Sequence, residues 1–373
     1  MISEAWLRVL HAARSGAAWR RAFFAADPAT PEALLARSDH TLAAAGIDAA
    51  GIARLRNPEP GALERLEAWL AAPGRALVPW GSPAYPARLA AIPSPPLALW
   101  TAGERPELLS APQIAIVGSR NATYGGRETA RRFGAYLSRS GLTVTSGLAI
   151  GIDAASHVGA LEGPGGTIAV LGHGLDRIYP AEHEALAARI ADSGLLVSEY
   201  PPGVAALPHH FPERNRIIAG LALGTLVVEA GRRSGALQTA RYASEYGREV
   251  FAIPGSIHNP LAKGCHALLK QGAKLVEEGA DVLVELARQI EIDVAPAAGI
   301  DADERAESAL TDDESYRNLL NAMGFEPVSF AEIQTRCGLT TAEVSSMLLL
   351  LELDGLVEAL PGGRYCRVET RSR

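Results

Sequence analysis

The feature that most constrains the fold is a series of short, apolar, β-branched runs that alternate with amphipathic stretches between residues 113 and 255. Each run is apolar almost throughout, as expected of a strand that is buried on both faces. Strands of this kind separated by helices predict a parallel sheet covered by helices on both sides, a Rossmann-like α/β core. The runs are 114–118, 142–147, 167–172, 195–199, 225–230 and 249–255.

The segments before the core differ from it in pattern. Residues 1–75 are rich in Ala and Leu at helical spacing, and turn signals at Asp27-Pro28, Gly46 and Gly51 divide them into short helices. A proline-rich connection follows, but Trp80, Tyr85 and other large apolar residues punctuate it. Residues of this size favour packing against a neighbour over exposure to solvent. We therefore expect a helical domain over 1–75 and an extended core domain over 76–288.

The C-terminal part has two sections. Residues 289–312 are acidic and poor in large apolar residues, which is typical of a flexible linker. Residues 313–373 give three helical patterns and then a hairpin around Pro361-Gly362-Gly363. This order predicts a winged-helix domain. Its expected recognition helix, within 340–355, carries acidic residues and no basic one, so reading of a DNA duplex is not expected.

Composition excludes several classes of protein. With 48% hydrophobic and 21% charged residues, the chain is expected to be globular. It has no apolar run of about 18 residues, and the acidic start at Glu4 does not fit a signal peptide. Three widely separated cysteines argue against a disulfide framework and against a thiolate zinc site. These observations predict a cytoplasmic protein with no membrane partner.

The net charge of −7 does not exclude an anionic ligand, because the acidity is concentrated at one end. Residues 291–373 contain 16 acidic and 7 basic residues, a net of −9, so the first 290 residues carry +2. Only Lys263, Lys270 and Lys274 are lysines, and they share one short stretch. A helix through all three would place them on one face, but Gly264 and Gly272 weaken it, so only Lys263 is selected.

Polar, glycine-containing segments follow several of the predicted strands, where ligands of open α/β sheets bind. Gly118-Ser119-Arg120 precedes a helix start, whose free N–H groups and adjacent guanidinium suit an oxyanion. A plain strand-to-helix turn explains the segment equally well. The next segment holds Ser146, Gly147 and Gly151 and again suggests a loop lined by N–H groups. Asp153 beside it is expected to cap the following helix.

Two further segments carry guanidinium groups. Phe211 stands before Arg214-Asn215-Arg216 near a helix start and could stack on a nucleobase, although core packing is the commoner use of such a ring. Glu229 begins a small-residue segment that contains Arg233, Ser234 and Gly235, with Thr239 one turn later. Both segments suit a phosphate-bearing ligand.

Motifs that carry catalysis are missing from the sequence. It contains no G-x-x-x-x-G-K-[ST], no G-x-G-x-x-G, no H-E-x-x-H and no G-x-S-x-G. Several anion-seeking loops without an evident base or metal ligand indicate a binder, and neither a cofactor nor a metal is expected. The alternative is a Rossmann-like nucleotide-processing enzyme of the phosphoribohydrolase type. Glu229 precedes Gly231 here, whereas such an enzyme has a P-G-G-x-G-T loop followed by its acid, which weighs against this alternative.

Taken together, the motifs resemble those of the DprA (DNA-processing protein A, or Smf) family. They cover about residues 85–284 in matching order, and any single motif would be weak evidence. The matching segments are GSR at 118–120, SGLAIGID at 146–153, GLDRIYP at 174–180, SEYP at 198–201, FPERNRIIAGL at 211–221, EAGRRSGALQTA at 229–240, REVFAIPG at 248–255 and GCHALLKQGA at 264–273.

The resemblance implies a non-enzymatic protein that binds single-stranded DNA, protects incoming strands during natural transformation and loads the RecA recombinase on them. It also implies a homodimer formed through the Rossmann domain, an N-terminal module like a sterile alpha motif (SAM) and a C-terminal winged helix. The residues expected at the DNA are Gly118, Ser119, Arg120, Ser146, Gly147, Gly151, Phe211, Arg214, Asn215, Arg216, Arg233, Ser234, Gly235, Thr239 and Lys263.

The sequence departs from the family pattern at a few places. His183 and His266 stand where members often carry asparagine, and Ala181-Glu182 stands where a basic residue is common. One phosphate contact of the family is therefore expected to be missing. The residues that would contact RecA are not readable from any motif.

Overall fold

The computed structural model describes residues 2–14, 16–287, 314–323, 326–354 and 356–368. These fall into two compact units, Met1–Ala295 and Pro296–Arg373, each with its own hydrophobic core. The predicted linker at 289–312 lies outside the described residues. Within the described ranges, no helix is both long enough and apolar enough to cross a membrane.

The N-terminal region folds as the expected short helices. Polar side chains begin three of them: Thr30, Ser38 and Asp48 each accept an N–H from the first turn of the following helix. Their apolar faces bury residues such as Leu34 and Leu42 in one core. The helices are α1 (Glu4–Ala13), α2 (Ala17–Phe24), α3 (Pro31–Leu35), α4 (Asp39–Ala44), α5 (Ala49–Arg56) and α6 (Ala62–Leu70).

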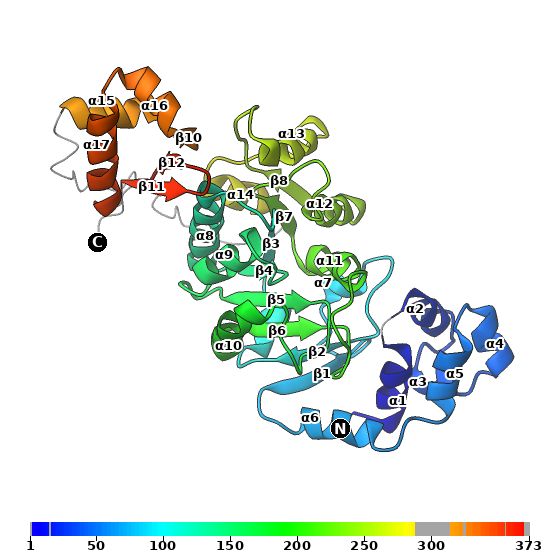
Figure 1. Ribbon diagram of the computed structural model, residues 1–373. Coiled ribbons are helices and arrows are strands. Elements are labelled where there is room, and N and C mark those ends of the chain that lie inside the picture. Colours follow the sequence, from blue (N-terminus) through cyan, green and yellow to red (C-terminus); the bar gives the residue numbers. More distant parts are fainter. Residues whose placement is uncertain (1, 15, 288–313, 324–325, 355, 369–373) are drawn as a thin grey trace. The chain divides into compact units, whose positions relative to one another are not determined.

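A nine-stranded sheet forms the centre of the first unit, in the order β1-β2-β6-β5-β4-β3-β7-β8-β9 (Figure 1). Strands β3 to β9 run parallel, whereas β1 and β2 come from the region of the proline-rich connection and extend the sheet antiparallel beyond β6. The strands are β1 (Arg75–Pro79), β2 (Ala98–Ala102), β3 (Gln113–Val117), β4 (Thr143–Ser146), β5 (Thr167–Leu171), β6 (Leu195–Ser198), β7 (Gly224–Val227), β8 (Glu249–Ala252) and β9 (Lys274–Leu275).

Helices cover both faces of this sheet, which confirms the predicted fold class. Along β3, Ile114 and Ile116 pack into one hydrophobic cluster, and Ala115 and Val117 pack into another, because alternate residues of a strand face opposite sides. The first cluster includes residues of α8 (Tyr124–Arg139), α9 (Ile152–Ala160) and α14 (Gly279–Leu286). The second includes residues of α7 (Ala87–Ala90), α11 (His210–Leu221), α12 (Ala236–Glu245) and α13 (Lys263–Lys270).

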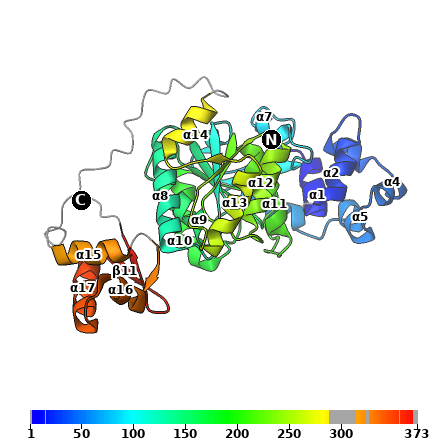
Figure 2. The same cartoon turned by 90° about the horizontal axis from the view of Figure 1, so that it is seen from above.

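The N-terminal helices pack against the core domain. Helix α10 (Glu184–Ser193) shares a hydrophobic cluster with the N-terminal helices, and α2 lies on the side of the sheet that carries α11 (Figure 2).

Helices α8 and α9 approach each other closely at two glycines. A Cβ added at Gly159 would lie only 1.9 Å from the carbonyl oxygen of Arg131, and one at Gly134 would lie 2.4 Å from that of Ser156.

Strand order places a topological switch point at β3. The chain runs from β3 through β4 and β5 to β6 on one side, and then returns to β7 on the other side of β3. In open α/β sheets, ligands bind outside the carboxyl ends of the strands at such a point. The loops after β3, β4 and β7 therefore define where a site is expected.

The C-terminal unit is a winged helix, as predicted. Its hairpin turns at Pro361, Gly362 and Gly363, and the two glycines have positive φ values. The helices are α15 (Glu314–Met323), α16 (Phe330–Cys337) and α17 (Thr341–Leu353), and the strands are β10 (Val328–Ser329), β11 (Val357–Leu360) and β12 (Arg364–Arg367).

Candidate functional site

The loops at the carboxyl ends of β3, β4 and β7 pack directly on one another. A Cβ at Gly118 would lie 2.5 Å from the Ile152 side chain and 2.9 Å from the carbonyl oxygen of Glu229. The Ser119 N–H donates to that same oxygen at 2.7 Å. Gly151 has a φ of +86°, and a Cβ there would lie 2.4 Å from the Ser119 carbonyl oxygen. The predicted segments thus meet at one rim of the sheet, which is called the rim below.

The start of α8, which we predicted as an open oxyanion site, already holds a carboxylate. Glu229 accepts the Thr123 N–H at 2.9 Å and the Thr123 hydroxyl at 2.7 Å. The Thr123 hydroxyl oxygen in turn accepts the Gly126 N–H at 2.9 Å. A Cβ at Gly126 would lie 2.4 Å from the Glu229 carboxyl carbon, so only glycine leaves room for it. The prediction missed this because Glu229 follows β7, more than 100 residues away along the chain.

The loop after β4 is also closed from within. The Gly147 N–H donates to Asp153 at 3.1 Å, and the Gly147 carbonyl oxygen accepts from Arg214 at 2.7 Å. Arg214 is only 3% exposed, and burial lowers the pKa of its guanidinium to about 10, with the nearby Arg120 charge adding to the effect. Burial likewise raises the pKa of Asp153, which the Arg214 charge opposes. Gly147, Asp153 and Arg214 therefore hold this loop in place.

Two imidazoles brace the middle of this loop. Leu148 has a φ of +55°, which side-chain-bearing residues seldom adopt. Its N–H donates to Nε2 of His157 at 3.3 Å, and its carbonyl oxygen lies 2.9 Å from Nδ1 of His183. Nδ1 of His157 lies 2.6 Å from the Thr167 hydroxyl, which itself donates to Val144. His157 is therefore neutral, with its proton on Nδ1. His183, which departs from the family pattern, contacts the Leu148 carbonyl oxygen and so helps to hold the loop.

The His157 brace predicts an acid-sensitive stability. Burial, followed by the Arg214 charge, lowers the pKa of His157 from 6.5 to about 3. Between these pH values the unfolded chain binds a proton that the folded protein does not, so stability falls as the pH drops below about 6.5. We expect His157→Gln, measured against the unsubstituted protein by urea unfolding at pH 7 and pH 5, to reduce this loss by about 1 kcal/mol or more. Equal pH dependence in both proteins would contradict the assignment.

Other predicted contact residues also have roles inside the protein. The Ser146 hydroxyl donates to the Ile116 carbonyl oxygen at 2.6 Å, and Thr239 is buried in α12. Arg216 is 5% exposed and forms an ion pair with Glu199, which Arg20 of α2 also contacts at 3.4 Å. These side chains are buried in this conformation. Sequence spacing could not show this, because their partners come from distant segments.

An aromatic and cationic surface remains open at the rim. The exposed guanidinium of Arg120 lies over the Phe211 ring, with its central carbon 5.7 Å from the ring centroid. The centroid of Tyr179 lies 5.5 Å from that of Phe211, and Tyr179 is 54% exposed. We call Arg120, Phe211 and Tyr179 the stacking platform. Tyr179 was missed as a site residue, although it falls within the GLDRIYP segment.

Further predicted residues in the loops after β7 and β8 are accessible. Arg233 and Gly235 are exposed, and Ser234 is half-buried. Nδ2 of Asn215 lies 3.4 Å from the Gly235 carbonyl oxygen, and the half-buried Lys263 donates to the Ile257 carbonyl. These groups offer hydrogen-bond donors and positive charge along the same rim.

The lysine stretch does not form one continuous helix. Helix α13 ends at Lys270, Gly272 has a φ of +97°, and Lys274 begins β9 and pairs with Glu285. The selection of Lys263 alone is consistent with this break. His266 is the other departure from the family pattern. Its Nε2 lies 3.0 Å from the carbonyl oxygen of Gly255, in the loop after β8.

Comparison with known proteins decides the family. The model for DNA recombination-mediator protein A matches residues 76–287, more than half of the chain. The chain belongs to this family. A second model, the DprA winged helix domain, matches residues 303–363. The resemblance to DprA noted in the sequence is thus confirmed.

Individual relatives agree with this assignment. Protein Smf of Escherichia coli is 44% identical over 302 residues, which is 80% of this chain and 79% of that protein. The X-ray structure of DprA from Streptococcus pneumoniae has a TM-score of 0.66 at 36% identity and covers 76% of this chain and 98% of that one. A structure concerning the single-stranded DNA binding mode of DprA from Helicobacter pylori has a TM-score of 0.51 at 27% identity, covering 55% and 93% of the two chains.

Proposed function

We propose that this DprA-family protein binds single-stranded DNA at the rim and acts as a recombination mediator without catalysing a reaction. The stacking platform carries this proposal, because it combines accessible aromatic rings with a guanidinium group. Unpaired bases stack on aromatic side chains whatever the DNA sequence, and each such contact contributes about 1–3 kcal/mol to binding. Arg233 and Lys263 would contact the backbone phosphates.

The closure of the loops changes the expected mode of binding. The Gly147 N–H and the start of α8 are occupied by Asp153 and Glu229, so side chains carry more of the contact than backbone amides do. Glu229 also serves as a structural acceptor for Thr123, which argues against its use as the acid of a phosphoribohydrolase-like enzyme. No observation favours that second function.

Family membership supports a wider role. We infer that the protein protects incoming strands in natural transformation and loads RecA on them, as a cytoplasmic homodimer paired through its Rossmann domain. The winged helix is not assigned to duplex reading, because α17 carries Glu343 and Glu352 and no basic residue. A protein contact or a structural role suits this domain better.

Fluorescence anisotropy with labelled oligonucleotides tests the proposal. We expect single strands to bind more tightly than the matching duplex, with little dependence on sequence. The logarithm of affinity should fall with the logarithm of salt concentration, with a slope of about 0.7 for each phosphate contact. A preference for the duplex, or binding that does not respond to salt, would contradict the proposal.

A further inference from the structure

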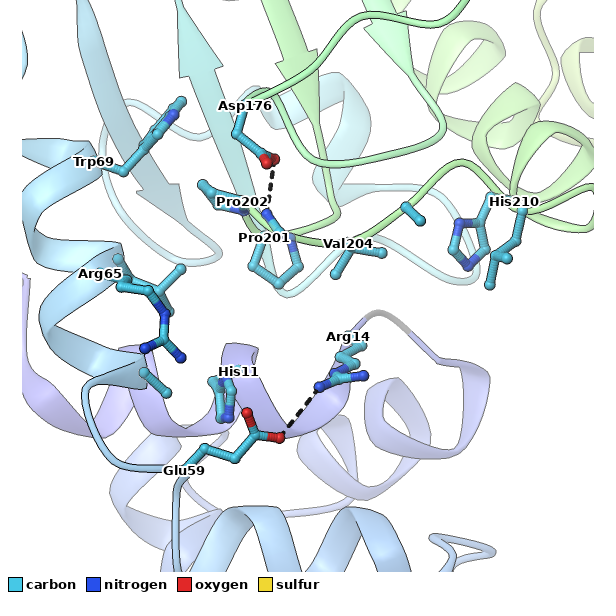
Figure 3. A pocket seen from close by; sticks show the side chains of 15 residues that line it. His11, Arg14, Glu59, Arg65, Trp69, Asp176, Pro201, Pro202, Val204 and His210 are labelled. Atoms are coloured by element: carbon cyan, nitrogen blue, oxygen red, sulfur yellow. Dashed lines mark hydrogen bonds and ion pairs between the residues drawn. The ribbon is translucent and has the colours of Figure 1, made fainter.

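A groove of about 610 Å³ lies between the N-terminal helices and the loop from β6 to α11 (Figure 3). One wall includes Arg14, which directly follows α1, and Arg65 of α6. The opposite wall is mainly apolar and includes Pro201 and Val204. None of the residues expected at the DNA lines this groove, so the site described above leaves it unassigned.

The groove is lined by equal numbers of guanidinium groups and carboxylates, but one guanidinium has no carboxylate partner in the part of the chain that the structure describes. The two carboxylates are both paired with arginines: Glu59 lies 3.8 Å from Arg14, and Asp176 lies 3.5 Å from Arg177. Arg65 is exposed, and its Nη1 lies 3.4 Å from the Pro60 carbonyl oxygen. Across residues 2–14 and 16–287, no carboxylate pairs with Arg65. Its guanidinium charge is therefore available to an anion.

The groove and the stacking platform are built on the same two loops. Tyr179 and Asp176 both belong to the segment after β5, and they serve the platform and the groove respectively. His210 lines the groove and immediately precedes Phe211 of the platform. The two loops are tied together where the Gly174 N–H donates to the Val204 carbonyl oxygen at 2.9 Å. A strand that leaves the platform along these loops would reach the groove.

We propose that the groove is a second subsite for the same single strand of DNA, a proposal that rests on the function proposed above. Arg14 and Arg65 would contact phosphates, and bases would lie against the apolar wall at Pro201 and Val204. Apolar surface next to guanidinium groups lets a flexible strand bury the faces of its unpaired bases while its phosphates meet positive charge. The N-terminal helices would thereby lengthen the bound segment of DNA.

The test compares short and long strands on the full chain. We expect an Arg14→Ala, Arg65→Ala double variant to bind an oligonucleotide of about 20 nucleotides roughly ten-fold more weakly, with a salt slope smaller by about 1.4. Its affinity for an oligonucleotide of about 5 nucleotides, which the platform alone can hold, should not change. Both side chains are at the surface, so folding should be retained, and thermal unfolding checks this.

Two controls separate the possible outcomes. Arg21→Ala removes an exposed charge of the same helical region outside the groove and should leave both affinities unchanged. Arg120→Ala should weaken the binding of both oligonucleotides. If Arg120→Ala weakens both strands while the groove variant weakens neither, the subsite is refuted and the proposed function stands. If the unsubstituted protein binds neither strand, the proposed function itself fails.

A direct readout complements the affinities. A long oligonucleotide with a photoreactive thymidine analogue at one end should crosslink to residues 201–207, and the groove variant should lose this crosslink. Crosslinks confined to the rim would overturn the proposal, and the groove would then be assigned to a ligand other than the bound strand.

Discussion

Phe211→Ala should lower the affinity for single-stranded DNA about ten-fold, because base stacking on one aromatic ring contributes roughly 1–3 kcal/mol. The loss is expected to be large here, since Phe211 occupies the centre of the stacking platform between Arg120 and Tyr179. Anisotropy titration with oligonucleotides of several sequences measures it. The loss should be similar for all sequences, because every base has a face that can stack.

Phe211 is half-buried, so its packing must be separated from its stacking. Phe211→Leu keeps most of the apolar volume but removes the aromatic face, whereas Phe211→Tyr keeps the ring. We expect the leucine variant to bind as weakly as the alanine variant and the tyrosine variant to bind normally. Normal binding by the leucine variant would show that the ring serves only as packing.

Gly159→Ala should destabilise the first unit by about 3 kcal/mol, the upper part of the range for overpacking. An added Cβ would lie 1.9 Å from the Arg131 carbonyl oxygen and 3.0 Å from the Ala135 nitrogen, and backbone atoms of a packed helix cannot move aside cheaply. Helices α8 and α9 would have to separate, and α9 carries both Asp153 and His157, which hold the loop after β4. Urea unfolding measures the loss, and DNA affinity should fall with it.

Gly125 offers a matched control in the first turn of α8. A Cβ there meets only the Thr123 hydroxyl oxygen at 3.9 Å, so Gly125→Ala should be neutral or stabilise the protein by a few tenths of a kcal/mol. If both glycine variants lose the same stability, the close approach of α8 and α9 does not explain the effect.

Local pattern was sufficient for much of this architecture. Apolar runs such as 114–118 predicted buried parallel strands, and the turn at Pro361 predicted the hairpin of the winged helix, because both depend on residues near one another in the chain. Parallel strands also end at one edge, so the meeting of the loops after β3, β4 and β7 could be anticipated. Motif order further identified the family.

Whether a polar side chain faces the ligand or the interior was decided by tertiary structure alone. Arg120 and Arg216 look equally suited to a phosphate in the sequence. Of these two, only Arg120 is exposed, because Arg216 pairs inside the protein with Glu199, which directly follows β6. Likewise, the sequence does not show that Glu229, from the loop after β7, accepts the Thr123 N–H at the start of α8. Burying an ion requires a compensating partner, and such partners are brought together only when distant segments fold against each other.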